Sequence, residues 1–315
     1  MKKSTDQFRR VTAVVLAVVL PASGPRSALG QVIGTELTAA VNLDASDAWV
    51  SGELFIADGI DEARCVMVVV DWGLGAGLYH NQELRQTVGS VGCGLLLLRM
   101  RFIRTRTANA GQIVRDAALG GSEGLGILAE DFARAFGRPE LATAPFLFWG
   151  HSAAGTFGLT YAGLHPDRTI AFVRHNSHLR DLPVDMGVLT GIPGLMIVGE
   201  DDQVAGTEDA RGLWAAGRAD QAPWAIAVQP GAPHNSARHL VEANALLLPW
   251  VAAVVELRLG SGDSGLRPVS VARGWIAGEG AREPMPAGLY SGAPHQASWL
   301  PDEATARGWQ RVTGN

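Results

Sequence analysis

The chemistry of this chain centres on Ser152, in the stretch Gly150-His151-Ser152-Ala153-Ala154-Gly155. The apolar residues 146–149 precede this stretch. A buried strand that ends here and turns at once into a helix would hold the serine hydroxyl on a tight turn above a sheet. The usual pattern of such a nucleophile is G-x-S-x-G, whereas here the fifth position is Ala154 and glycine comes one residue later. Taken alone, the motif fits equally a helix start at which Ser152 is only an N-cap.

An acidic turn and a histidine follow along the chain, each after an apolar run of strand length. Residues 194–198 lead into a turn that ends at Asp202, and residues 225–228 lead through a turn with Pro and Gly to His234. Both side chains therefore lie just past the carboxyl end of an expected strand. Open parallel sheets place their ligands at that edge.

These residue types complement one another chemically. A serine hydroxyl needs a nearby base to take its proton, and a histidine, with an ordinary pKa of about 6.5, can take that proton and return it. An acid orients the imidazole and stabilises its charged form. We therefore predict Ser152 as the nucleophile, His234 as the base and Asp202 as the acid. Glu200 and Asp201 are the alternatives for the acid.

The chain order Ser, acid, His is that of the α/β-hydrolase fold. Residues 50–258 resemble an α/β-hydrolase, nearer the esterase and lipase branch than any other. Residues 161–168, followed by the apolar residues 169–173, are similar to the helix end and strand that follow the nucleophile in that family, and the turn from Gly199 to Asp202 resembles its acid loop. The resemblance implies a mostly parallel central sheet flanked by helices. No insertion of 50 or more residues separates Val173 from Leu195, so we expect no large cap domain.

An acyl-transfer enzyme also needs donors for the oxyanion of its tetrahedral intermediate. The resemblance implies the Ala153 amide as one donor and an amide of the loop after the third strand as the other. That strand is expected at residues 66–70, and Asp71 stands where many esterases carry a histidine. We predict Trp72 or Gly73 as the second donor.

Substrate contacts are expected beside the nucleophile, at Trp72 and His151. The glycines at 73, 75 and 77 also invite comparison with a phosphate-binding loop, but no Lys-Ser/Thr follows them and the G-x-G-x-x-G spacing is missing. The sequence therefore favours an ester substrate, small or polymeric, over a nucleotide, and we expect no cofactor.

The N-terminus is typical of a secretory signal peptide. Four basic residues precede residue 11, an apolar core occupies residues 11–20, and Ala28-Leu29-Gly30 offers small residues for cleavage. The core is too short for a permanent membrane span, which needs about 20 residues. We expect a secreted or periplasmic protein, cleaved near Gly30.

Two cysteines, Cys65 and Cys93, open the expected third and fourth strands. An oxidising compartment permits a disulfide between them, although neighbouring parallel strands orient side chains awkwardly, so two buried thiols remain the alternative. His175 and His178 form an isolated pair without the further ligands of a zinc site, and we predict no metal. The favoured interpretation of the pair is a polar loop after the sixth strand that lines the rim of the active site.

Composition agrees with one enzyme domain. Apolar residues make up 47% of the chain, and a net charge of −5 argues against nucleic acid as a partner. A basic cluster after the fourth strand is expected to pair with nearby acids or to face water, and steering of an anionic substrate is the alternative; its members are Arg99, Arg101, Arg104 and Arg106. Residues 108–126, rich in Gly and Ala, are expected to form a loop that gates substrate access.

The sequence thus divides into a signal peptide (1–30), an α/β-hydrolase catalytic domain (31–258) and a Gly- and Pro-rich tail (259–315). The tail shows no convincing strand, but Trp275, Trp299 and Trp309 favour packing on the main domain, or gripping a polymer surface, and a short helix is expected after Asp302.

The predicted function is a secreted serine hydrolase that cleaves carboxylic esters of short to medium acyl chains through an acyl-enzyme. An aspartate nucleophile is disfavoured because Ser152 holds that position. The alternatives on the same triad are a thioesterase, an acyltransferase and a serine peptidase. A non-catalytic scaffold used for binding is the alternative of a different class.

Overall fold

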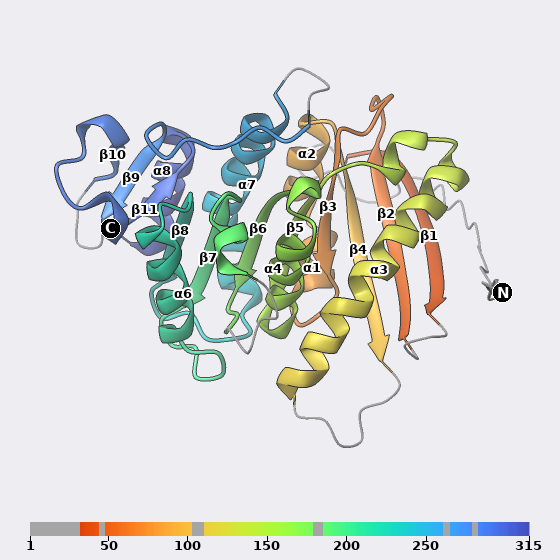
Figure 1. The fold of residues 1–315 in the computed structure, drawn as a ribbon, viewed down its shortest axis with the longest axis horizontal. Helices are drawn as coiled ribbons and strands as arrows, with labels where there is room; N and C mark the ends of the chain where they lie inside the picture. The colour runs from red at the N-terminus through yellow and green to blue at the C-terminus, as the bar shows by residue number, and fades with distance from the viewer. Residues whose placement is uncertain are drawn as a thin grey trace, which may run out of the picture.

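The computed structural model describes residues 32–43, 48–102, 110–178, 185–260, 265–278 and 283–314. Their centre is an eight-stranded sheet in the order β1-β2-β4-β3-β5-β6-β7-β8 (Figure 1). The antiparallel strands β1 (Gly34–Leu43) and β2 (Ala48–Ala57) form one edge. The other strands run parallel: β3 (Cys65–Val70), β4 (Cys93–Phe102), β5 (Phe146–His151), β6 (Thr169–His175), β7 (Gly194–Gly199) and β8 (Trp224–Gln229). The predicted signal peptide lies outside the described residues.

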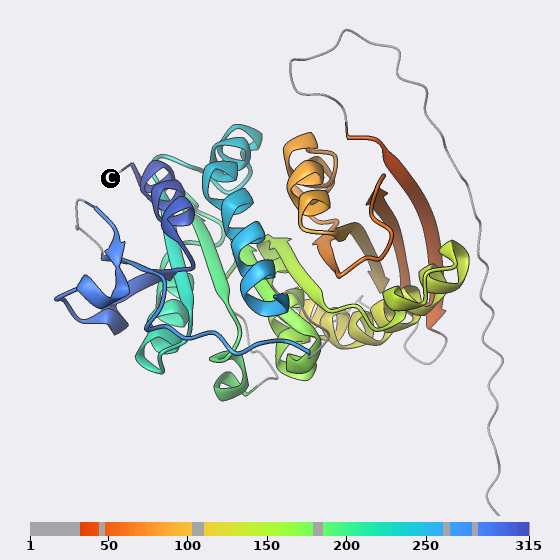
Figure 2. The ribbon, with the colours of Figure 1, turned by 90° about the horizontal axis from the view of Figure 1, so that it is seen from above.

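Helices cover both faces of the sheet, as Figure 2 shows from above. One face carries α1 (Gly75–Tyr79), α2 (Gln82–Ser90), α7 (Ala237–Leu259) and α8 (Glu303–Thr313), and the other carries α3 (Ala110–Phe136), α4 (Gly155–Leu164), α5 (Met186–Leu189) and α6 (Glu208–Ala219). The strands β3, β5, β6 and β7 are buried throughout. Their nearly continuous apolar sequences follow from this burial on two faces.

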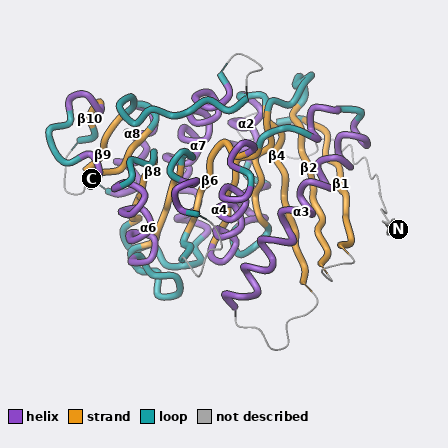
Figure 3. Tube along the Cα trace, in the orientation of Figure 1, coloured by secondary structure: helices purple, strands orange, loops and turns teal. Residues whose placement is uncertain are grey.

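The helix α3 corrects one sequence expectation, because residues 110–126 were predicted to be part of a gating loop (Figure 3). The glycines of this segment are contact positions of the helix. A Cβ on Gly121 would collide with Met100 and Phe157, and one on Gly124 would lie 2.5 Å from Val50. The small residues therefore let α3 approach the sheet and its neighbouring helix closely, at a cost in helix propensity that this packing offsets.

One described helix, α7, is long and apolar enough to cross a membrane by length and composition. Half of its most apolar stretch is buried inside the protein, with Leu247, Trp250 and Val254 in the core. A core helix passes the same test, and this packing accounts for its apolar sequence.

Cys65 and Cys93 are joined by a disulfide, with their Cα atoms 4.6 Å apart. They are paired residues at the first positions of β3 and β4. The structure therefore has the bridge, where the sequence allowed either a bridge or two thiols. The bridge lies at the amino ends of the strands, away from the edge that carries the predicted triad.

The C-terminal segment is more ordered than its composition indicated. It forms an antiparallel sheet of β9 (Trp275–Gly278), β10 (Met285–Pro286) and β11 (Ala297–Leu300), followed by α8. The predicted short helix is confirmed, with a capping box at Asp302. These strands escaped sequence reasoning because two to four residues are too few to show the alternating pattern of a strand.

This segment covers the outer edge of β8. Ser298 Oγ hydrogen-bonds both the amide (2.9 Å) and the carbonyl (3.2 Å) of Ile226, and Trp309 Nε1 donates to the same carbonyl (2.6 Å). The buried Arg218 donates to the carbonyls of Pro294 (2.6 Å) and Ala297 (2.7 Å). An exposed edge strand would offer unpaired backbone groups, which this packing covers.

The buried tryptophans of this segment also correct a sequence expectation. Trp299 and Trp309 are 1% and 3% exposed, so they are core residues and cannot grip a polymer surface.

Candidate active site

The turn at Ser152 has the geometry that the motif predicted. The chain leaves β5 at His151, passes through a short 3-10 helix (Ser152–Ala154) and continues into α4. Ser152 has a φ of 55°, in the left-handed region that residues with a side chain rarely adopt. A Cβ on Gly150 would collide with the Ala154 carbonyl. The N-cap interpretation fails, since the cap position of this short helix is His151.

The glycine one place later than usual also has a contact that requires it. A Cβ on Gly155 would lie 2.5 Å from Oγ of Ser177, a buried residue just after β6. Ser177 Oγ in turn accepts a hydrogen bond from the buried Arg174 (3.0 Å). The start of α4 thus packs directly on the chain that follows β6, which leaves no room at 155 for a larger residue.

Ser152, His234 and Asp202 lie together, as predicted from the sequence. The Oγ of Ser152 is 2.9 Å from Nε2 of His234, and Nδ1 of His234 is 2.8 Å from Oδ2 of Asp202. The three residues come from the ends of β5, β7 and β8, at the lower edge of the sheet in Figure 1. These distances allow His234 to take the serine proton while Asp202 holds the other ring nitrogen.

The second oxygen of Asp202 is bound by backbone donors. Oδ1 accepts hydrogen bonds from the amides of Val204 and Ala205, both at 2.8 Å. Burial acts to raise the pKa of Asp202, but the hydrogen bonds from His234 and these two amides outweigh it and keep that pKa below its ordinary value. Asp202 is therefore ionised at neutral pH, as an orienting acid must be.

The two alternative acids lie elsewhere in the turn. Asp201 is exposed, and Glu200 is also exposed and accepts a hydrogen bond from the Gly231 amide (3.0 Å). Among the three consecutive acids, Asp202 is the one hydrogen-bonded to His234. These contacts decide which of the three acids lies beside His234, a choice that the sequence left open.

His151 lies where it cannot contact a substrate, contrary to our expectation. Its side chain is fully buried, and Nε2 is 2.8 Å from the backbone carbonyl of His234. Because a carbonyl only accepts, Nε2 carries the proton. Burial lowers the pKa of His151, so the ring stays neutral. His151 therefore supports the backbone of His234 by a hydrogen bond to its carbonyl.

The hydrogen bonds of the loop after β3 favour Gly73 over Trp72 as the second oxyanion donor. The Trp72 amide donates to the Val70 carbonyl (2.9 Å), whereas within the described chain the Gly73 amide has no acceptor. Gly73 has a φ of 57° and lies against the ring of His151, beside the nucleophile. The Trp72 side chain is 56% exposed, so it is free to contact a bound molecule.

An ion pair anchors this loop at the position that a histidine occupies in many esterases. Asp71 accepts a hydrogen bond from Nε of Arg99 (2.8 Å), and Arg99 also pairs with Glu53 on β2. The predicted pairing of the basic cluster with nearby acids is thus confirmed for Arg99, but its predicted place after the fourth strand is wrong, because Arg99 lies within β4. The side chains of Arg101, Arg104 and Arg106 lie outside the described residues.

His175 and Asn176 lie near the triad, in the segment that the sequence predicted to be a polar loop on the rim of the active site. Asn176 and His175, at the end of β6, are 3% and 1% exposed. The ring of His175 is 5.9 Å from that of His151, centre to centre, and burial lowers its pKa to about 3. The rim-loop prediction is wrong for these two residues, because His175 ends β6 and both side chains are buried. The sequence assigned neither a role in the site, although their place at the carboxyl end of a parallel strand was a signal.

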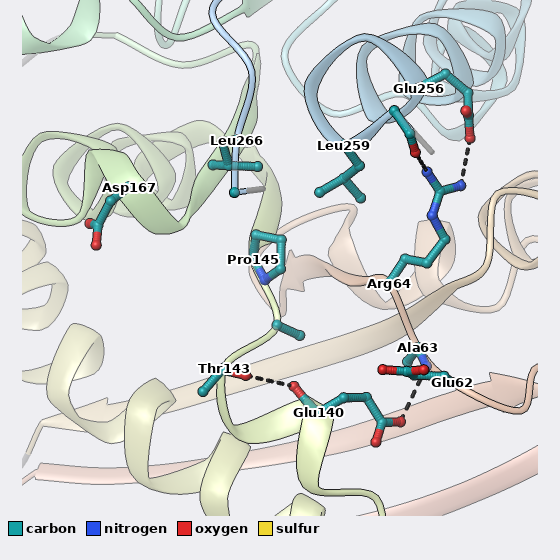
Figure 4. A pocket seen from close by; sticks show the side chains of 13 residues that line it. Glu62, Ala63, Arg64, Glu140, Thr143, Pro145, Asp167, Glu256, Leu259 and Leu266 are labelled. Carbon is teal, nitrogen blue, oxygen red and sulfur yellow. Dashed lines mark hydrogen bonds and ion pairs between the residues drawn. The ribbon is translucent and has the colours of Figure 1, made fainter. Parts of the chain in front are cut away.

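A pocket of about 600 Å³ lies at the opposite edge of the sheet (Figure 4). Its lining residues include Glu62, Arg64 and Glu140 near the amino ends of the strands, and Arg64 is paired with Glu256 (2.7 Å). None of the predicted site residues lines it. Within the described residues, no group of three or more His, Cys, Asp or Glu side chains could hold a metal ion.

Comparison with known proteins gives similarity in structure alone. No family profile matches the chain, and no curated protein matches it in sequence. A solved ferulic acid esterase superposes with a TM-score of 0.52 at 13% identity, over 71% of this chain and all of that one. An S-formylglutathione hydrolase from Agrobacterium tumefaciens (TM-score 0.48, 13% identity, 72% and 96% covered) and a thermostable esterase (0.48, 14%, 62% and 54%) are also similar. At this level of identity the first likeness shows a common fold.

Proposed function

We propose that this protein, which has the α/β-hydrolase fold, is a serine hydrolase that cleaves carboxylic esters through an acyl-enzyme. The observation that carries the proposal is the chain of hydrogen bonds from Ser152 Oγ to His234 and from His234 to Asp202 (2.9 and 2.8 Å). A protein that used this fold only for binding would not require this geometry or the left-handed backbone at Ser152.

The reaction begins when Ser152 Oγ attacks the ester carbonyl carbon and its proton passes to Nε2 of His234. Asp202 stabilises the imidazolium. The amides of Ala153 and Gly73 are the proposed donors to the oxyanion, because the first amides of a helix have no intrahelical partner and the Gly73 amide is unpaired among the described residues. His234 then protonates the leaving alcohol, and a water molecule deacylates the serine by the same route.

The proposed substrates are esters with short to medium acyl chains. The exposed Trp72, within the proposed oxyanion loop and next to Gly73, offers an apolar surface for one side of the substrate. Between β6 and β7 the described residues hold only the four-residue helix α5. A site with so little chain to cover it suits small esters better than long chains, because ligand pockets bury most of the surface of the ligand.

Secretion or export to the periplasm is part of the proposal. It rests on the basic, apolar and small-residue pattern of residues 1–30. The disulfide between Cys65 and Cys93 supports it, because disulfides persist in oxidising compartments.

A fluorophosphonate probe tests the mechanism on the purified protein. We expect labelling of Ser152, found by mass spectrometry, and no labelling of the Ser152→Ala variant. An unlabelled wild-type protein, under conditions in which a known serine hydrolase reacts, would contradict the proposal and favour a binding scaffold. Matched p-nitrophenyl esters, thioesters and peptide anilides then separate the esterase from a thioesterase or a peptidase, and faster turnover of long acyl chains would overturn the proposed acyl preference.

A further inference from the structure

Asn176 joins the two loops that carry His234 and Asp202. It directly follows β6 and is 3% exposed. Its Oδ1 accepts a hydrogen bond from the amide of Gly199 (2.7 Å), the last residue of β7. Its Nδ2 donates to the backbone carbonyls of His234 (2.9 Å) and Pro233 (3.3 Å). This orientation of the amide is the one that satisfies all three partners, since the Gly199 amide can only donate and the carbonyls can only accept.

The loops that follow β7 and β8 are thereby both held to one side chain at the end of β6, the neighbouring strand of β7 in the sheet. On the acid side, the amide of Asp202 donates to the Gly199 carbonyl (3.2 Å), so Gly199 opens the turn that ends at the acid. A Cβ on Gly199 would collide with the Ala232 carbonyl. The turn that leads to Asp202 therefore packs directly on the loop that leads to His234. Asn176 bonds to the first residue of one loop and to the catalytic residue of the other.

The backbone carbonyl of His234 receives two hydrogen bonds from buried donors. One comes from Asn176 and the other from Nε2 of His151 (2.8 Å). A carbonyl oxygen has two lone pairs, so both are used. With its carbonyl fixed from two sides, the backbone of His234 has little freedom to shift, and its ring is held at the distance that Ser152 requires.

The backbone of Asn176 is itself in an unusual conformation. Its φ is 46°, in the left-handed region, where asparagine is tolerated better than most residues. Its amide donates to the Ile197 carbonyl of β7 (2.8 Å), which holds this turn against the sheet.

We propose that Asn176 is a positioning residue for catalysis, which sets the placement of His234 relative to Asp202 and Ser152 through the backbone of the two catalytic loops. This inference rests on the proposed function, because it assumes that His234 is the catalytic base. It assigns Asn176 no contact with the substrate. Removal of the Asn176 side chain should therefore slow the chemical step and leave substrate binding nearly unchanged.

The test is steady-state hydrolysis of p-nitrophenyl butyrate by full-length variants. Asn176→Gly keeps the left-handed backbone without strain and removes the three side-chain hydrogen bonds. We expect kcat to fall about 100-fold, because small displacements of a catalytic group have costs of this size, with KM within about threefold of wild type. Asn176→Asp keeps the shape but turns an oxygen toward two carbonyls, and we expect at least the same loss. The matched control is Asn244→Ala, a buried asparagine on α7 without a hydrogen-bond partner among the described residues, and its kcat should stay within about twofold.

The outcomes are distinct from those for the proposed function. An active, fluorophosphonate-labelled wild type, combined with a folded Asn176→Gly variant of unchanged kcat, would overturn the positioning role alone. A rise in KM at constant kcat would overturn it too, since it would indicate a contact with the substrate. If neither Asn176→Gly nor Asn176→Asp folds, His151→Phe provides the test, because it removes the other donor to the His234 carbonyl. An unchanged kcat in His151→Phe would contradict positioning through this carbonyl.

Discussion

Gly73 lies so close to His151 that a Cβ at position 73 would collide with Nδ1 of the imidazole. His151 directly precedes the proposed nucleophile, and its other ring nitrogen bonds to the His234 carbonyl. The proposed oxyanion loop after β3, the turn at Ser152 and the loop that carries His234 therefore meet at one buried ring. A change in any of them reaches the other two through this contact.

Gly73→Ala should reduce kcat by about 100-fold or more, because it displaces the proposed oxyanion donor and adds a side chain in the left-handed region. Ester hydrolysis by the folded variant measures the effect. Gly77→Ala is the control, since a Cβ at Gly77, in the neighbouring helix α1, meets no atom within 4 Å. Full activity of Gly73→Ala would show that the oxyanion is bound elsewhere.

Asp202→Asn should lower kcat by about 10⁴-fold, since an amide cannot hold the imidazole in the required tautomer or stabilise its charge. Asp201→Asn, one residue earlier and exposed, should change kcat by less than about twofold. Kinetics of both variants with one p-nitrophenyl ester measure the difference. Equal losses in the two would contradict the assignment of the acid.

His175 should make the protein less stable as the pH falls. Burial, together with the neighbouring His151 and His234, lowers its pKa to about 3, whereas the unfolded chain has an ordinary value of about 6.5. Between these values the unfolded state binds a proton that the folded state refuses, so the free energy of unfolding decreases on acidification. From pH 7 to pH 5 this contributes about 2 kcal/mol of lost stability.

Urea denaturation of His175→Leu at the two pH values measures this effect, because the variant should lose less stability than wild type on acidification. Asp202, the nearby carboxylate, stays ionised over this range. His295→Gln, at an exposed site, is the control and should match wild type. Parallel pH profiles for His175→Leu and wild type would mean that His175 accepts a proton in the folded state.

The double variant Cys65→Ala/Cys93→Ala should unfold with a free energy about 3.6 kcal/mol lower than wild type. The bridge closes a loop with a sequence separation of 28, and the estimate follows from the entropy that the loop removes from the unfolded chain. The value of kcat should not change, because both cysteines lie at the strand ends opposite the triad. Two free thiols in the denatured, unreduced wild type would contradict the bridge.

The sequence by itself determined the fold and the identities of the proposed triad. Apolar runs ending at Ser152, at the acid turn and at His234 can be recognised locally, and parallel strands bring their carboxyl ends to one edge whatever the connecting helices are. The α/β-hydrolase fold predicted from this pattern is confirmed by the strand order and by the likeness in structure.

Tertiary contacts decided what local patterns leave open. Asp202 differs from Glu200 and Asp201 by its hydrogen bond to His234, which depends on how two loops pack. The glycines of α3 indicate a loop in the sequence, and only their close contacts with the sheet and α4 explain why they lie in a helix. The C-terminal strands are defined by their pairing with one another, which no local pattern shows. Asn176 has no reactive side chain, and its position among three strand ends gives it the role proposed here. The residue types that do chemistry can be identified in the sequence, but the packing that holds them at working distance is a property of the folded chain.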